Sequence, residues 1–214
     1  MGSLKREIIE ALLMPDFGQI VKLSHNKKKV FRTLISLSYD KEDILSWRAI
    51  EAMGKAVCAL AESDPSAARN IVQRLLWSIR DESGGIGWGA PEMLGEIVRS
   101  SPKIFADLPP VIFSFHDEEP FLKGILWAMG RIVDVIDCPV EGAKELAVKC
   151  LEHKDPSVRG TAVWAASRLG VDGIGAKVET LLKDEGKFKF YEGNELRDMT
   201  VGGMADRFTG HIKS

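Results

Sequence analysis

The chain has 214 residues, of which 45% are hydrophobic, so it is long enough to bury one substantial core. It carries 29 Lys and Arg against 31 Asp and Glu, which gives a formal net charge of -2 at pH 7. A chain without net positive charge has no overall field to concentrate nucleic acid or an anionic membrane, so neither is expected as a partner.

The cysteines Cys58, Cys138 and Cys150 are odd in number and show no Cys-x-x-Cys or Cys/His ligand spacing. We expect them to act as small apolar residues in a reducing compartment. The first residues lack the long apolar run of a signal peptide, and no later run reaches membrane-spanning length. These features predict a cytoplasmic protein without a metal site or cofactor.

An amphipathic helix is predicted from Leu4 to Leu13, before Pro15, as an N-terminal cap within residues 1–24. Five helical hairpins are then predicted at approximately residues 25–61, 64–100, 102–135, 139–170 and 172–210, within a single domain. Asp-Pro-Ser signals at residues 64–66 and 155–157 predict helix starts, because Asp accepts bonds from free amides and Pro fits the first helical position. The last hairpin is predicted to have helices near residues 175–184 and 194–208, and no β-strand is predicted anywhere.

A small residue recurs at the equivalent place in each predicted second helix. These residues are Gly54, Gly95, Gly130, Ser167 and Ala205, at separations of 41, 35, 37 and 38. Periods in this range are typical of stacked helix pairs, which bury a continuous core and present an extended concave surface. The predicted fold class is therefore all-α, an α-α superhelix forming a right-handed solenoid.

The best-defined unit runs from Asp155 to Gly170 and has the spacing Asp-Pro-x-Val-Arg, Ala, Ala, Arg-Leu-Gly. This spacing resembles HEAT repeats, within them the short phycobilisome-lyase-like variety. The resemblance implies that the second helix of each pair lines the concave face and that residues of the Arg159 type tie neighbouring repeats together. It further implies a role in scaffolding and partner recognition.

Counting from Val158 as position 0, positions 2 and 6 of the second helices lie one turn apart on the same face. They read Trp47/Glu51, Trp88/Glu92, Lys123/Trp127, Gly160/Trp164 and Asp198/Gly202. With the orientation that the resemblance implies, this stripe predicts a groove with aromatic walls and two carboxylates, suited to a cation or an amide-rich segment. The alternative is that the indoles only fill the wedge between neighbouring helices, and both interpretations remain open.

A second candidate is the polar, glycine-rich connection from Arg80 to Glu92, which includes Asp81, Glu82, Gly85 and Trp88. Glycines permit close backbone approach, so this segment could wrap a ligand or deliver Trp88 and Glu92 into the groove. It could equally be an ordinary folded connector. The apolar segment Phe188 to Tyr191 is expected to cover the core of the last repeat, with closure of the groove end or partner binding as alternatives.

These patterns predict a non-enzymatic interaction or scaffold protein that binds a protein partner along its concave face, with tryptophans as anchors. The alternative is a small-molecule-binding or enzymatic HEAT protein, either a bilin-lyase-like accessory protein or one similar to alkylpurine DNA glycosylases. HEAT-repeat di-iron hydroxylases carry repeated His-Glu pairs, which this chain lacks. No catalytic residue, metal ligand or cofactor site is assigned from the sequence.

Overall fold

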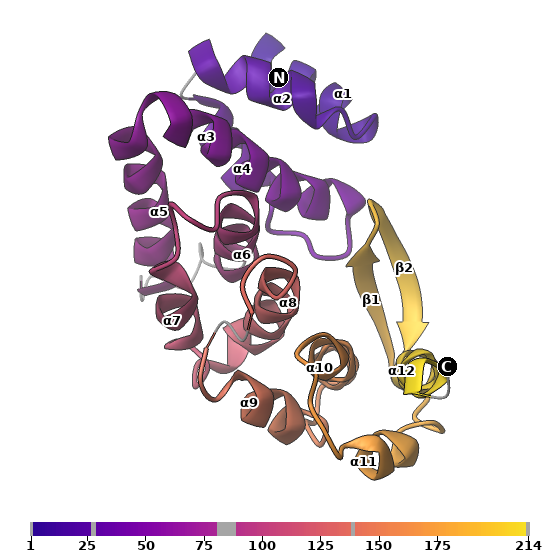
Figure 1. Ribbon diagram of the computed structural model, residues 1–214. Coiled ribbons are helices and arrows are strands. Elements are labelled where there is room, and N and C mark those ends of the chain that lie inside the picture. The colour runs from indigo at the N-terminus through magenta and orange to yellow at the C-terminus, as the bar shows by residue number, and fades with distance from the viewer. Residues whose placement is uncertain (1, 27–28, 81–88, 138–139, 213–214) are drawn as a thin grey trace.

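The computed structural model describes residues 2–26, 29–80, 89–137 and 140–212 (Figure 1). Over these ranges the chain is mostly helical and ends in one two-stranded antiparallel sheet followed by a helix. The elements are α1 Ser3–Leu13, α2 Phe17–Asn26, α3 Lys29–Leu37, α4 Ile44–Ser63, α5 Pro65–Arg80, α6 Ala90–Ser100, α7 Leu108–Phe113, the 3-10 helix η1 Glu119–Phe121, α8 Leu122–Ile132, α9 Ala143–Cys150, α10 Pro156–Arg168, α11 Gly175–Thr180, β1 Lys187–Glu192, β2 Glu195–Thr200 and α12 Val201–Ile212.

Two of the helix starts follow from the Asp-Pro signals. The Asp155 carboxylate accepts a bond from Ser157 N at 2.7 Å at the start of α10. At the start of α5, the Asp64 carboxylate accepts a bond from Ala67 N at 2.9 Å. Each carboxylate satisfies a donor that the first helical turn leaves free, and the proline that follows needs no donor there. Both predicted starts are confirmed.

The most extensive contacts between helices join helices that are next but one along the chain: α4 packs on α6, α6 on α8, α8 on α10 and α10 on α12 (Figure 1). The recurrent small residues lie at these contacts. A Cβ on Gly54 would stand 2.5 Å from the Glu96 carbonyl oxygen of α6, and one on Gly95 would stand 2.7 Å from the Ala128 Cβ of α8. A Cβ on Gly130 would overlap the Trp164 ring of α10. Small residues therefore recur because successive helices approach to backbone distance.

The prediction of a helix over residues 194–208 is wrong for its first part, because residues 195–200 form β2 and α12 begins only at Val201. The expectation that no strand exists is wrong for the same reason. Gly193 and Asn194 both have positive φ, at 61° and 65°, and make the two-residue turn that joins β1 to β2. Burial of Phe188, Phe190 and Tyr191 holds this β1–β2 hairpin against the helices.

The first helix was predicted from Leu4 to Leu13, which agrees closely with α1 at Ser3–Leu13. The helix α2 was not predicted; it completes the N-terminal layer that packs on α4. None of the helices in the described ranges combines the length and the apolar character that crossing a bilayer requires.

Candidate functional site

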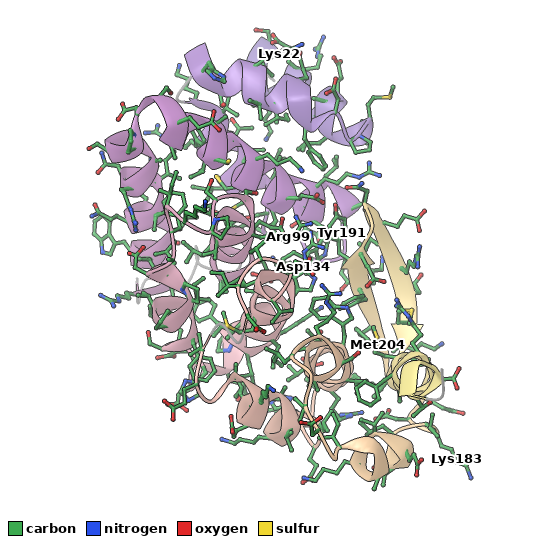
Figure 2. The ribbon with its side chains drawn as sticks, in the orientation of Figure 1. Lys22, Arg99, Asp134, Lys183, Tyr191 and Met204 are labelled. Carbon is green, nitrogen blue, oxygen red and sulfur yellow. The ribbon has the colours of Figure 1, made fainter. Side chains whose placement is uncertain are left out.

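The inner row is the set of side chains at positions 2 and 6 of α4, α8 and α10, and β1 lies along it. Its members are Trp47, Glu51, Lys123, Trp127, Gly160 and Trp164. Figure 2 shows Tyr191 on the inner side of the hairpin, directed toward these helices. The face predicted to be a groove is thus occupied by the chain's own strand.

From α8, Lys123 and Trp127 bond the edge of β1 that faces away from β2. Lys123 Nζ donates to the Lys189 carbonyl at 3.4 Å, and Trp127 Nε1 donates to the Tyr191 carbonyl at 3.3 Å. Four residues of helix rise about 6 Å, and two residues of strand rise about 6.6 Å, so the spacings of donors and acceptors match. Side chains of a helix therefore satisfy a strand edge that would otherwise lack partners.

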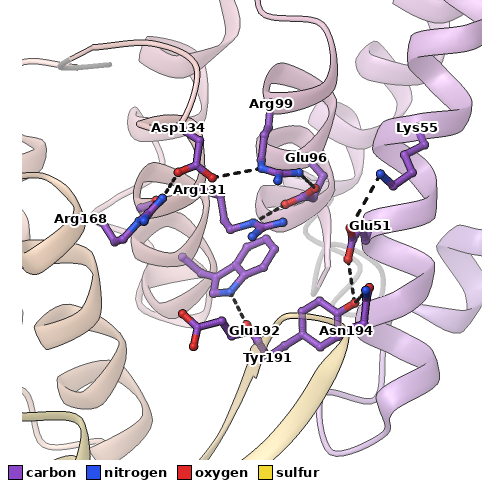
Figure 3. Close-up of polar contacts among 12 residues, drawn as sticks. Glu51, Lys55, Glu96, Arg99, Arg131, Asp134, Arg168, Tyr191, Glu192 and Asn194 are labelled. Carbon is purple, nitrogen blue, oxygen red and sulfur yellow. Dashed lines mark hydrogen bonds and ion pairs between the residues drawn. The ribbon is translucent and has the colours of Figure 1, made fainter. Parts of the chain in front are cut away.

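On α4, the contacts of the inner row converge on Tyr191. The Tyr191 ring stacks on the Trp47 ring, with centroids 5.6 Å apart and an interplanar angle of 10°. Its hydroxyl donates to Glu51 Oε2 at 2.8 Å (Figure 3). Burial, followed by the neighbouring charge of Glu51, raises the pKa of the Tyr191 phenol, because both oppose a phenolate. The phenol is consequently a fixed donor at neutral pH.

Along α10 the row receives the phenylalanines of β1. The Phe188 ring lies directly on the Cα of Gly160, where a Cβ would overlap it. The Phe190 ring meets the Trp164 ring at 5.1 Å and 61°. Trp164 Nε1 donates to Glu192 Oε1 at 3.3 Å, so the hairpin is bonded at its turn as well as packed. The Phe188 ring therefore leaves no room for a side chain at position 160.

The interpretation of the inner row as an open aromatic pocket needs correction. Trp47, Trp127 and Trp164 are 1%, 1% and 7% exposed, and β1 supplies their neighbours. Asp198, predicted to continue the stripe, lies on β2, and Gly202 packs against the Leu182 carbonyl. The fifth tryptophan, Trp77 on α5, was outside the predicted stripe and is strongly exposed.

Glu92 lies buried in the first turn of α6, beside the row. Lys41 Nζ is 3.0 Å from Glu92 Oε1, whereas Glu92 Oε2 has no hydrogen-bond partner among the described residues. The carboxylate lies against Gly124, where a Cβ would come within 2.7 Å of Oε2. Burial lowers the pKa of Lys41 and of Lys123, and the charge of Glu92 opposes this shift in both. The sequence predicted Glu92 and Lys123 as partner- or ligand-binding residues but missed Lys41.

Arg80 ends α5 and is exposed, with its guanidinium 5.6 Å from the centroid of the Phe115 ring. The other predicted residues of this connection, Asp81, Glu82, Gly85 and Trp88, lie outside the described residues. Both interpretations of the connection therefore stay predictions.

A second set of side chains, which we name the charged row, crosses the helices next to the inner row. It comprises Lys55 of α4, Glu96 and Arg99 of α6, Arg131 and Asp134 at α8, and Arg168 of α10 (Figure 3). Glu96 is 1% exposed and accepts from Arg131 Nε at 2.7 Å and from Arg99 at 3.4 Å. Asp134 pairs with Arg99 at 3.3 Å and with Arg168. The pairs bridge successive helices.

The sequence contained a signal for the charged row. Lys55, Glu96, Arg131 and Arg168 all follow the recurrent small residue directly, at position 10 of the same alignment. The predicted site, which consists of positions 2 and 6 and the connection from Arg80 to Glu92, does not include these residues. A hollow of about 570 Å³ opens beside the row, lined by residues that include Lys55, Cys58, Arg99 and Asp134.

Over the described ranges, no three His, Cys, Asp or Glu side chains converge in a way that could hold a metal ion. No known protein-family model matches the chain. A protein of Archaeoglobus fulgidus, described as uncharacterized, is 30% identical over 165 residues, which are 76% of this chain and 86% of that protein.

Proposed function

Since the chain belongs to the same family as this uncharacterized archaeal protein, whose description names no activity, we propose a function from the geometry: a non-enzymatic interaction protein of the HEAT-like kind. The alternate packing of α4, α6, α8, α10 and α12 through small residues supports a solenoid of helical hairpins. The five repeats and the right-handed superhelix predicted from the sequence are part of this proposal.

The partner would contact the charged row. One observation supports this choice. Charged side chains of the row, which come from successive helices, stay partly exposed to solvent, whereas the inner row is covered by β1. The side chains of Lys55 and Arg168 are 41% and 40% exposed, against 1% for Trp47 and Trp127. Alternating charges from several helices recognise a polar segment that carries both signs, and they favour specificity and association rate over affinity. We therefore expect a protein partner whose binding weakens as salt rises.

The experiment is affinity purification of the tagged full chain from its own organism, with quantitative mass spectrometry. Lys55→Glu reverses one charge of the row at a residue whose ion pair with Glu51 is long, at 4.0 Å, so the fold should tolerate it. Lys183→Glu is the matched control, because Lys183 is exposed and points away from the row near α11 (Figure 2). We expect Lys55→Glu to deplete a partner that Lys183→Glu retains. Equal recovery with both variants would contradict a partner on the charged row.

A small-molecule or enzymatic role is the second candidate. It is favoured by Glu92 Oε2, which is buried and has no hydrogen-bond partner in the part of the chain that the structure describes, since buried polar atoms are normally bonded. A thermal-shift screen of metabolites would test it, because a ligand of the native state raises the melting temperature. The shift should disappear in Glu92→Gln. Of the two Trp/Glu pairs that resemble those of DNA glycosylases, Trp47/Glu51 is engaged by Tyr191, whereas Trp88 of the pair Trp88/Glu92 lies outside the described residues.

A further inference from the structure

The outer edge of β2 carries backbone groups without partners. The two-residue turn makes Glu192 and Glu195 a hydrogen-bonded pair, so the pairs Tyr191–Leu196 and Lys189–Asp198 direct their backbone groups away from the partner strand. On β1 these outward carbonyls accept bonds from Trp127 and Lys123. On β2, the outward amides and carbonyls of Leu196 and Asp198 have no such bond within the described residues.

This edge is also accessible. Glu195, Arg197 and Asp198 are exposed, Leu196 is half-buried, and no described helix or strand lies on the far side of β2 (Figure 1). An exposed strand edge is a template for another strand. The native chain carries no proline within β2 that would block such pairing.

We propose that β2 pairs with β2 of a second copy of this chain, antiparallel about a twofold axis at Leu196, to form a four-stranded sheet. In this register Leu196 lies opposite its own copy and exchanges two backbone bonds with it. Glu195 of each copy lies opposite Arg197 of the other, at the closer, non-hydrogen-bonded spacing. Within one copy these two side chains pair with each other on their own strand, at 2.6 Å.

Other registers are less favourable for reasons that the sequence of β2 supplies. Only Leu196, Asp198 and Thr200 direct backbone groups outward, so an antiparallel pairing must align members of this set. An axis at Asp198 would set Asp198 against its own copy, and like charges directly opposite one another are destabilising. Pairing Leu196 with Asp198 would set Arg197 against Arg197. The axis at Leu196 alone places two opposite-charge pairs around an apolar pair.

With the axis at Leu196, only residues 195–197 of β2 lie opposite β2 of the other copy. This short edge buries much less than the roughly 1,200–2,000 Å² of a stable interface, so the dimer is weak. We expect a monomer–dimer equilibrium with a dissociation constant between about 10 µM and about 1 mM. Sedimentation velocity of the full chain, over a concentration series that reaches about 1 mM, measures it.

Arg197→Glu replaces both attractive pairs by repulsion and should weaken dimerisation by about tenfold or more. Glu195→Arg combined with Arg197→Glu restores opposite charges across the axis and should return the dissociation constant to within about threefold. Leu196→Pro removes the central amide donor, which faces away from β1, and should abolish the dimer while circular dichroism stays native.

Three results would overturn the proposal. The first is a chain that remains monomeric over the whole series. The second is a dimer that Arg197→Glu leaves unchanged, which would place the contact elsewhere. The third is a dimer that Asp198→Asn strengthens strongly, which would move the axis to Asp198. Cross-linking of Leu196→Cys to its own copy, compared with Thr209→Cys on α12 as a control, would support the register directly.

Discussion

The hydroxyl of Tyr191 should contribute measurably to stability through its bond to Glu51. Tyr191→Phe removes the hydroxyl, which also bonds Asn194 Oδ1 at a longer 3.3 Å, and leaves the ring stacked on Trp47. A bond to a charged acceptor contributes about 1.5–3 kcal/mol, but Glu51 is 12% exposed and keeps Lys55 at 4.0 Å. We therefore expect a loss of about 1–2 kcal/mol in the free energy of unfolding. Tyr191→Ala also removes the buried ring and should cost about 3–5 kcal/mol.

Urea unfolding followed by circular dichroism measures these losses, and a double-mutant cycle with Glu51→Gln isolates the bond. The pKa of Tyr191 is raised on folding, so the stability this phenol contributes is fully present below its unfolded pKa of about 10. It is lost as pH rises from there toward the folded pKa, and Tyr191→Phe should make this alkaline decline shallower. The bond would be refuted if the free energy of unfolding of Tyr191→Phe lay within about 0.3 kcal/mol of the wild-type value and its decline at alkaline pH were unchanged.

Three further predictions concern packing, buried charge and thiol reactivity. Gly54→Ala should lower the free energy of unfolding by about 1–3 kcal/mol, because its Cβ would stand 2.5 Å from a backbone carbonyl of α6. The control is Gly175→Ala, whose Cβ meets no atom within 4 Å, and it should be neutral or slightly stabilising in the same urea assay. Equal losses would contradict the close helix contact. Burial lowers the pKa of both Lys41 and Lys123, but only Lys41 lies 3.0 Å from the buried Glu92 carboxylate. Lys41→Met leaves that carboxylate unpaired and should cost about 3–5 kcal/mol. Lys123→Met removes a buried charge together with the donor to the Lys189 carbonyl, and these effects oppose each other, so its loss in the same urea assay should be much smaller. Burial raises the pKa of Cys150 to about 11, so iodoacetamide at pH 8 should modify this thiol slowly until the chain unfolds, and rapid labelling of the native chain would show that the site opens.

Local signals were sufficient where a segment's structure depends on its own residues. The Asp-Pro starts of α5 and α10 and the amphipathic α1 could be predicted because caps and hydrophobic periodicity act within one or two turns. The recurrent small residues could be identified because each pair of successive helices makes a similar close contact. Their alignment also placed positions 2 and 6 of α4, α8 and α10 on one face, whereas Asp198 of the predicted stripe lies on β2.

The β1–β2 hairpin could not be predicted from periodicity alone. Leu196 and Met199 are three residues apart and fit a helical face, while in the structure they lie on opposite faces of β2. The hairpin is stabilised by contacts of β1 with α10 and α8 and of β2 with α4, all remote in sequence. The signal that was available is the Gly193-Asn194 pair after alternating Phe188 and Phe190, a pattern typical of a two-residue hairpin turn.

Occupation of the inner row changes where this molecule can meet others. A partner that anchored on Trp47 or Trp127 would have to remove Tyr191 and its strand, together with several buried aromatic contacts of about 0.5–1.5 kcal/mol each beyond their burial. The charged row and the outer edge of β2 require no such displacement. Their chemistries differ, because the charged row offers exposed ion pairs and β2 offers backbone bonds around Leu196. The proposed dimer also depends on exposed Glu195–Arg197 pairs, so added salt should weaken both contacts. Charge reversal separates the two surfaces, because Lys55→Glu should weaken only the partner on the charged row and Arg197→Glu only the dimer.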